Sequence, residues 1–181
     1  MILPVIDKMN FADIVPVLAI LTENNLETWT FDGLASEIER PDSLNLVGKF
    51  KGEAIGYSIS RLIMNNHYTL PNNNADQRKN HKTSENTTYF KYDFEIYSIA
   101  VKKQYQNYGV GQILLNNIVL QAQKTDTESI WLEVRKSNKQ AIGFYKKNNF
   151  KEISERKNFY LNPSENAIVL RKKLEAISKI V

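Results

Sequence analysis

Gln106-Asn107-Tyr108-Gly109-Val110-Gly111-Gln112 is the stretch that decides the fold, because it joins a strand-like apolar run to a segment with helical spacing. Its two glycines stand where the helix is expected to begin. The first N–H groups of a helix have no partner within it, and the positive end of the helix dipole lies there. Without Cβ atoms, a phosphate can approach this backbone closely. A tight turn needed only for packing accounts for the two glycines equally well.

Two established phosphate-binding patterns do not match this stretch. A Walker loop requires Gly-Lys followed by Ser or Thr, and the dinucleotide-binding fingerprint requires a third glycine. Neither feature occurs here. The residues alone therefore leave an anion-binding turn and a packing turn as open alternatives.

Strands and helices alternate in the sequence around this turn. An aromatic and β-branched run predicts a long strand before it, and a helix from Gly109 to about Lys124 is expected to face inward with Val110, Ile113, Leu114, Ile118 and Leu120 or Ala122. This alternation predicts an α/β domain whose central sheet is at least partly parallel. Strand 89–101 is expected directly before the turn. After the helix that follows the turn, the expected elements are strand 129–135, helix 138–148, strand 150–156, strand 167–170 and a terminal helix 174–181.

The first third of the chain predicts a strand, two helices and a hairpin. Asp13 is expected to cap a helix through Asn24, and a second helix follows Thr30 until Pro41 ends it. Lys51-Gly52-Glu53 predicts the hairpin turn. The strands expected here are 2–6, 44–50 and 54–63, and the polar, asparagine-rich segment 65–88 is expected to be a flexible insertion loop.

Composition and charge exclude several classes of site. The 181 residues include no Cys and two His, so a thiolate nucleophile, a disulfide framework and a Cys-based or His-based metal centre are not expected. No apolar run reaches the roughly 20 residues of a membrane span, and no secretory signal is evident, which predicts a cytoplasmic protein. Residues 1–101 carry a formal charge of −4 and residues 102–181 carry +8. This asymmetry suggests an anionic ligand on the second half, although solvated lysines alone also produce it.

Two carboxylates on predicted strands are candidates for a general base. Glu133 lies in Ser129–Arg135, and an ionised carboxylate on a buried strand is costly unless it is paired or functional. A salt bridge from Glu133 to Arg135 or to a nearby lysine is the alternative. Glu95 is a second carboxylate of the same kind, either another base or a solvated charge.

The helix expected after this strand contributes two polar candidates. Asn138 is a suitable N-cap, and Tyr145 lies two turns further along. A tyrosine at this spacing is commonly a core residue with a hydrated hydroxyl. By itself, Tyr145 therefore does not indicate a function.

Together these features resemble the GNAT superfamily of acetyl-CoA-dependent N-acetyltransferases. The family pattern Gln/Arg-x-x-Gly-x-Gly/Ala corresponds to Gln106–Gly111, and the preceding strand ends in Ile99-Ala100-Val101. Within the superfamily, the bacterial ribosomal-protein alanine N-acetyltransferases are similar to this chain at Trp131–Asn138, Ala141-Ile142, Phe144-Tyr145, Phe150 and Arg156–Tyr160.

The resemblance implies a fold and a ligand. The fold is a central mixed, mostly antiparallel sheet with a parallel splayed strand pair and helices on both faces, in a single domain over residues 1–181. The ligand is acetyl-CoA, a co-substrate that needs no metal and no covalent enzyme intermediate. The residues implied to bind it are Ile99, Ala100, Val101, Asn107, Tyr108, Gly109, Val110, Gly111, Gln112 and Asn138.

The resemblance also implies a reaction at an amine. Glu133 would be the general base, Tyr145 the proton donor to the departing thiolate, and a backbone N–H around Ile99 the oxyanion donor, with the thioester held between Glu133 and Tyr145 in one crevice. A peptide α-amine has a pKa near 8 and is mostly protonated at pH 7, so a base is useful. The expected acceptor is a protein or peptide N-terminus, best of all the N-terminal alanine of a ribosomal protein.

Three departures from the family pattern bear on the acceptor rather than on the chemistry. Asn149-Phe150 replaces the usual Gly-Phe, the insertion 65–88 replaces a short turn, and residues 1–64 match only faintly. The alternatives are therefore an acetyltransferase of a small-molecule amine or a protein lysine, and a non-catalytic acyl-CoA sensor. A nucleic-acid-binding module is the weakest alternative, because the C-terminal lysines are not interleaved with aromatic residues.

Overall fold

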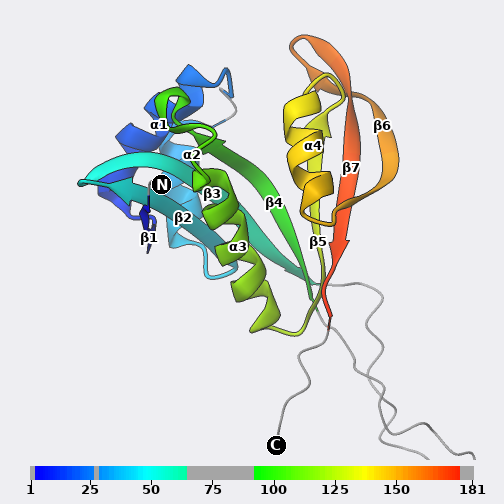
Figure 1. The fold of residues 1–181 in the computed structure, drawn as a ribbon, viewed down its shortest axis with the longest axis horizontal. Coiled ribbons are helices and arrows are strands. Elements are labelled where there is room, and N and C mark those ends of the chain that lie inside the picture. The colour runs from blue at the N-terminus through cyan, green and yellow to red at the C-terminus, as the bar shows by residue number, and fades with distance from the viewer. Residues whose placement is uncertain (1–2, 27–28, 65–91, 176–181) are drawn as a thin grey trace, which may run out of the picture.

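The computed structural model describes residues 3–26, 29–64 and 92–175, and one seven-stranded sheet organises them (Figure 1). The strands are β1 (Val5–Lys8), β2 (Ser43–Phe50), β3 (Glu53–Met64), β4 (Tyr92–Val101), β5 (Thr127–Arg135), β6 (Lys151–Leu161) and β7 (Ser164–Lys173). Their order across the sheet is β1-β2-β3-β4-β5-β7-β6. Only the β4–β5 pair is parallel among these strands, and the other neighbours are antiparallel.

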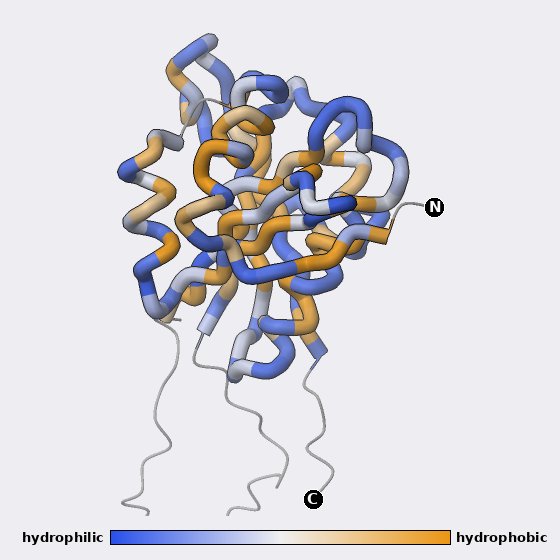
Figure 2. Tube along the Cα trace, turned by 90° about the vertical axis from the view of Figure 1, so that its left-hand side faces the viewer, coloured by the Kyte–Doolittle hydropathy of each residue, from blue (hydrophilic) through white to orange (hydrophobic). Residues whose placement is uncertain are grey.

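Helices cover both faces of this sheet. One face carries α1 (Ile14–Glu23) and α2 (Phe31–Glu39), which pack with β2, β3 and Ala100 in one apolar core. The other carries α3 (Val110–Gln123) and α4 (Lys139–Lys147), which pack with the central strands in a second core. Hydrophobic and hydrophilic residues accordingly alternate along the elements in Figure 2. The expected mixed sheet with helices on both faces is confirmed.

The two parallel strands separate halfway along their length. Their pairing runs from Tyr92 opposite Thr127 to Ile96 opposite Leu132 and goes no further. Beyond that point β4 stays paired with β3 to Val101, while β5 stays paired with β7 to Arg135. A register shift in the β3–β4 ladder leaves Tyr97 as an extra residue between Ile96 and Ser98, which is a β-bulge that bends β4 away. The result is the V between β4 and β5 in Figure 1.

Several boundaries at the N-terminal end differ from expectation. The first strand is Val5–Lys8 rather than 2–6, and Asp13 stands at the expected N-cap position of α1 but its side chain makes no cap hydrogen bond there. Asn10 caps a preceding 3₁₀ turn, Phe11–Asp13, by accepting from the Ala12 N–H (2.9 Å). The Asp13 side chain is buried. Its carboxylate accepts a hydrogen bond from Asn10 N–H (3.0 Å) and forms an ion pair with Lys49 (2.8 Å). The helix expected after Thr30 is α2, and the Thr30 side chain caps it by accepting from Gly33 N–H.

The C-terminal strands are longer than the sequence indicates. The strand expected at 150–156 runs over Lys151–Leu161, and the one expected at 167–170 runs over Ser164–Lys173. Of the two alternatives expected to face inward near the end of α3, Ala122 is buried and Leu120 is exposed, and Leu115 is buried in addition. Strand 89–101 begins within the described residues at Tyr92. The insertion 65–88 lies outside the described residues, and so does the expected terminal helix 174–181 from residue 176 on; its first two residues, Leu174 and Glu175, are not helical.

A buried ion pair fixes α2 to the sheet. The Glu37 carboxylate, 3% exposed, accepts from Ser43 Oγ (2.5 Å) and from two guanidinium nitrogens of Arg61 on β3. Burial raises the pKa of Glu37, but the hydrogen bonds from Arg61 and Ser43 and the charge of Arg61 together lower it below its ordinary value. The pair therefore stays ionised at neutral pH, with its charges compensated.

Glu37→Gln is expected to lower the free energy of unfolding by about 3 kcal/mol, because it leaves the Arg61 charge without its partner. Urea unfolding measures this loss. Asp42→Asn is the matched control: Asp42 pairs with Arg40 on the surface, and such pairs contribute about 1 kcal/mol or less. Equal losses in the two variants would contradict the importance of the buried pair.

Candidate active site

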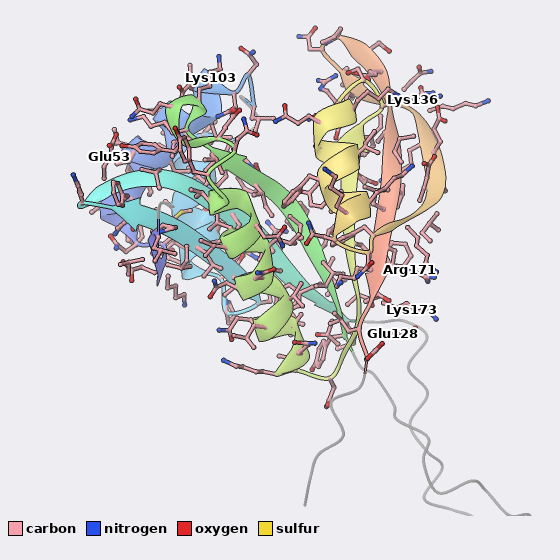
Figure 3. All side chains as sticks on the ribbon, viewed as in Figure 1. Glu53, Lys103, Glu128, Lys136, Arg171 and Lys173 are labelled. Carbon is pink, nitrogen blue, oxygen red and sulfur yellow. The ribbon has the colours of Figure 1, made fainter. Side chains whose placement is uncertain are left out.

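A cleft of about 720 Å³ lies between the separated ends of β4 and α4. Among the described residues, its walls combine the end of α1, the end of β4, the turn before α3 and one side of α4. The lining residues are Asn24, Leu26, Ile99, Ala100, Val101, Tyr105, Gln106, Asn107, Gly109, Val110, Gly111, Gln112, Asn138, Lys139, Gln140, Ala141, Gly143, Phe144, Tyr145 and Lys147. In Figure 3, Lys103 and Lys136 lie on either side of the end where the two halves of the sheet diverge, while Glu128 and Lys173 lie at the end where the strands converge.

The turn before α3 presents backbone N–H groups to this cleft. Asn107 (φ 64°) and Gly109 (φ 88°) adopt the left-handed conformation, which asparagine and glycine tolerate best. The first backbone bond of α3 runs from Ile113 N–H to Gly109 O (3.0 Å), so the N–H groups of residues 110–112 precede the helical ladder. Alternating conformations of this kind form concavities that bind anions. The geometry therefore favours the anion-binding interpretation.

Gly111 distinguishes between the two interpretations of the glycines. A Cβ built on Gly111 would meet only Val101 Cγ2, at 3.7 Å, which is an ordinary contact. Packing within the described protein thus does not require glycine at this position. What glycine leaves open is the space in front of the N–H groups, where a bound anion would lie.

Side chains that the sequence analysis missed hold this turn in place. Gln106 Nε2 donates to Val101 O (3.1 Å) and to Asn24 Oδ1 (3.0 Å), and Asn24 Nδ2 also donates to Val101 O (3.2 Å). Asn24 ends α1, some 80 residues earlier in the chain. Nothing in the sequence around Asn24 indicates this contact, since only the folded sheet brings α1 beside the turn.

Helix α4 forms the opposite wall. The Asn138 side chain caps it by accepting from Ala141 N–H (3.0 Å), as expected. Lys139, Gly143 and Lys147 all line the cleft at intervals of four residues, so they share one face of the helix. Two ammonium groups on this face attract an anionic ligand. The spacing was visible in the sequence but was not recognised there.

Tyr145 lines the cleft from α4. It is 7% exposed and packs edge-on against Phe144 and Phe150, with ring centroids 5.2 and 5.3 Å away. Burial raises the pKa of its phenol well above the ordinary value, and the charges of Tyr57 and Tyr160 act in the same direction. The hydroxyl is therefore protonated at neutral pH and is available as a donor.

Glu133 does not line the cleft, so the expectation of one crevice shared with Tyr145 is wrong. Strand side chains alternate, and because Leu132 and Val134 are buried in the core with α3 and α4, Glu133 faces the other side of the sheet. There it accepts from Arg156 Nη1 and borders a second hollow of about 240 Å³. Asp93 and Glu95 border the same hollow. Glu133 directly follows the last β4–β5 pair, at the vertex of the V.

Nine of the ten residues expected to bind the ligand line the cleft; Tyr108 does not, and its side chain is 54% exposed. Gln112 contributes its backbone, because its side chain exchanges hydrogen bonds with Asn148 at the end of α4 (2.6 and 3.0 Å). This contact joins α3 to the end of α4.

No helix among the described residues is long and apolar enough to span a bilayer.

Comparison with known proteins shows which family has this fold and cleft. The model of the acetyltransferase (GNAT) family matches residues 14–150, which span both walls of the cleft. The chain belongs to the GNAT family. This GNAT protein is 34% identical over 113 residues to the ribosomal protein bS18-alanine N-acetyltransferase of Haemophilus influenzae, covering 56% of the chain and 77% of that relative. It is an N-acetyltransferase of GNAT type.

Solved structures share the fold of this GNAT protein. The crystal structure of the ribosomal-protein-S18-alanine N-acetyltransferase from Escherichia coli aligns with a TM-score of 0.75 at 21% identity, covering 99% of both chains. Arabidopsis thaliana NAA60 in complex with acetyl-CoA aligns with a TM-score of 0.73 at 14% identity, covering 95% of this chain and 99% of that one. The V between β4 and β5 thus belongs to a GNAT fold.

Proposed function

We propose that this GNAT protein transfers acetyl from acetyl-CoA to the N-terminal α-amine of a protein, with the N-terminal alanine of a ribosomal protein as the preferred acceptor. The observation that carries the proposal is the V between β4 and β5, which has a cleft suited to phosphates on one face of the sheet and an acid-lined hollow on the opposite face. A thioester placed in the V is accessible from both sides. A ribosomal acceptor also implies a cytoplasmic reaction.

The residues of the cleft fit acetyl-CoA. The N–H groups of residues 110–112 would hold the diphosphate, with Lys139 and Lys147 as counter-charges on α4. The edge of β4 would hold the pantetheine amides. Lys102 N–H donates to Ile55 O (2.9 Å) on β3, and N–H directions alternate along a strand, so the N–H groups of Ile99 and Val101 face the V. When bound, acetyl-CoA supplies the activated acyl group.

Two side chains would carry the proton transfers, and one backbone N–H would stabilise the negative charge on the thioester oxygen by a hydrogen bond. The Glu133 carboxylate would accept a proton from the incoming ammonium group, directly or through water, so that the amine attacks in its neutral form. The Ile99 N–H would donate to the thioester oxygen as negative charge develops there. The Tyr145 hydroxyl would donate a proton to the sulfur as the C–S bond breaks, and the second proton lost by the attacking nitrogen would return to the Tyr145 phenolate. The products are an N-acetyl amide and free coenzyme A.

Gly111→Leu is expected to weaken coenzyme A binding about tenfold, because the family pattern accepts alanine at this position but a longer side chain fills the space before the N–H groups. The same change is expected to leave the free energy of unfolding unchanged or to raise it by up to about 1 kcal/mol, since leucine is a better helix former than glycine. Calorimetric titration and urea unfolding measure the two effects. Unchanged affinity would contradict a diphosphate at this turn.

The acceptor is tested with purified protein, acetyl-CoA and matched substrates. The first is a peptide with a free N-terminal alanine; the second is the same peptide with a blocked N-terminus and an internal lysine; the third is a polyamine. Mass spectrometry is expected to show an acetyl group only on the peptide with the free N-terminal alanine. Acetylation of the lysine peptide or of the polyamine would instead support those acceptors.

The ribosomal acceptor is tested in cells. Intact ribosomal proteins from cells with and without this chain are compared by mass spectrometry of their N-termini. A ribosomal protein that loses N-terminal acetylation when the chain is absent supports the proposal. Unchanged acetylation of every ribosomal protein would overturn this acceptor while leaving the peptide activity standing.

A further inference from the structure

The ring of Tyr97 stands where β4 leaves β5. Tyr97 is the bulge residue directly after the last paired residue of β4, and it is 40% exposed. Its contacts with Trp29 and with Arg61 place it on the face that carries α1 and α2, which is also the face of Glu133. Tyr97 therefore projects beside the V on the side opposite the cleft.

This ring is held by contacts on its face, edge and hydroxyl. The Arg61 guanidinium lies 4.9 Å from the ring centroid, and the Trp29 ring meets it edge-on with centroids 6.5 Å apart. The Glu95 carboxylate bonds the hydroxyl; burial first, and then Glu95, raises the pKa of Tyr97 to about 12, so the phenol stays neutral. Such a ring forms a fixed wall.

Hydrogen bonds to Glu37 fix Arg61 in turn. Its guanidinium makes a double hydrogen bond to Glu37, whose carboxylate is buried under α2 and also accepts from Ser43. A planar guanidinium bound on one edge has little freedom to rotate, which is why it stacks stably on an aromatic ring. The buried ion pair thus controls where the Tyr97 ring lies.

We propose that Tyr97 is a specificity-determining residue that limits the first side chain of the acceptor to a small one, and that Arg61 and Glu37 are positioning residues for its ring. This inference rests on the proposed function. An amine that approaches the V beside Glu133 carries its first side chain only two bonds from the nitrogen. That side chain must pass the Tyr97 ring, which cannot withdraw without breaking the stack on Arg61.

The test compares two peptides that differ only in their first residue, alanine or leucine. For the wild-type protein, kcat/KM is expected to favour alanine by about 50-fold, within the range by which pockets discriminate apolar side chains. Tyr97→Phe keeps the ring and is expected to keep this ratio within about threefold. Tyr97→Ala is expected to reduce the ratio below about five by raising kcat/KM for the leucine peptide.

Arg61→Met tests the positioning role, because it keeps Tyr97 but removes the stack and the ion pair. It is expected to relax the ratio about fivefold, a change that a loss of stability does not produce, since both peptides are measured on the same folded protein. Tyr92→Ala, a tyrosine truncation at the closed end of β4, is the control and is expected to leave the ratio unchanged.

A failure of this inference can be distinguished from a failure of the proposed function. A Tyr97→Ala variant that loses activity equally on both peptides would overturn the size limit but not the proposed function, and so would a wild-type protein that uses both peptides equally well. A wild-type protein that acetylates neither peptide would overturn the proposed function and this inference with it.

Discussion

Tyr145→Phe is expected to lower kcat about 100-fold or more while leaving the affinity for coenzyme A within about threefold. The phenyl ring keeps its packing against Phe144 and Phe150, so the cleft retains its shape. What disappears is the one hydroxyl that would protonate the departing sulfur. Steady-state kinetics give kcat, and calorimetric titration gives the affinity.

A matched control for this variant is Tyr92→Phe, which removes a phenol hydroxyl at the closed end of β4 and is expected to leave kcat unchanged. An unchanged kcat for Tyr145→Phe would exclude Tyr145 as the proton donor. Binding of acetyl-CoA without measurable turnover by the wild-type protein, on any amine, would instead favour a non-catalytic acyl-CoA sensor.

Glu133→Gln is expected to lower kcat/KM for an N-terminal peptide about 100-fold at pH 7, where most of the amine is protonated. The size of this loss in kcat/KM is expected to depend on pH in a defined direction. Above the amine pKa of about 8 the amine is neutral without help, so the difference between wild-type and variant is expected to shrink as the pH rises to about 9. A pH series of kcat/KM measures both effects.

Two further variants locate the base. Glu152→Gln removes an exposed carboxylate on β6 that pairs with Lys146, and it is expected to leave kcat/KM unchanged. Glu95→Gln removes the second candidate base, which borders the same hollow as Glu133. If Glu95→Gln shows the larger loss at pH 7, the role of general base belongs to Glu95.

Local pattern was sufficient for most of the fold. The helix start at the glycines 109 and 111, the alternation of strands and helices, the helix after Thr30 and the cap at Asn138 each depend on neighbouring residues, and each prediction was confirmed. Strand β6 was harder to predict because ten of its eleven residues are exposed, so its sequence lacks the apolar alternation that marks a strand. Its length depends on pairing with β7.

The site depends more on contacts between distant residues. Asn24 reaches Gln106 across 82 positions, and Arg61 reaches Glu37 across 24, so neither contact has a local signature. The face on which Glu133 lies follows from the register of β5, which a single strand cannot reveal when both of its faces carry apolar residues. The sequence thus indicated candidate site residues but not which side of the sheet each one occupies.

The two outermost strands also bear on how this chain behaves at high concentration. An open sheet edge offers unpaired backbone groups to any passing strand, and this is a common origin of aggregation. One border of the sheet is β1, only four residues long, and the other is β6, which carries Lys151, Glu152, Glu155, Arg156 and Lys157. Joining another strand there would strip water from these charges, so the sheet resists growth into fibrils from either border.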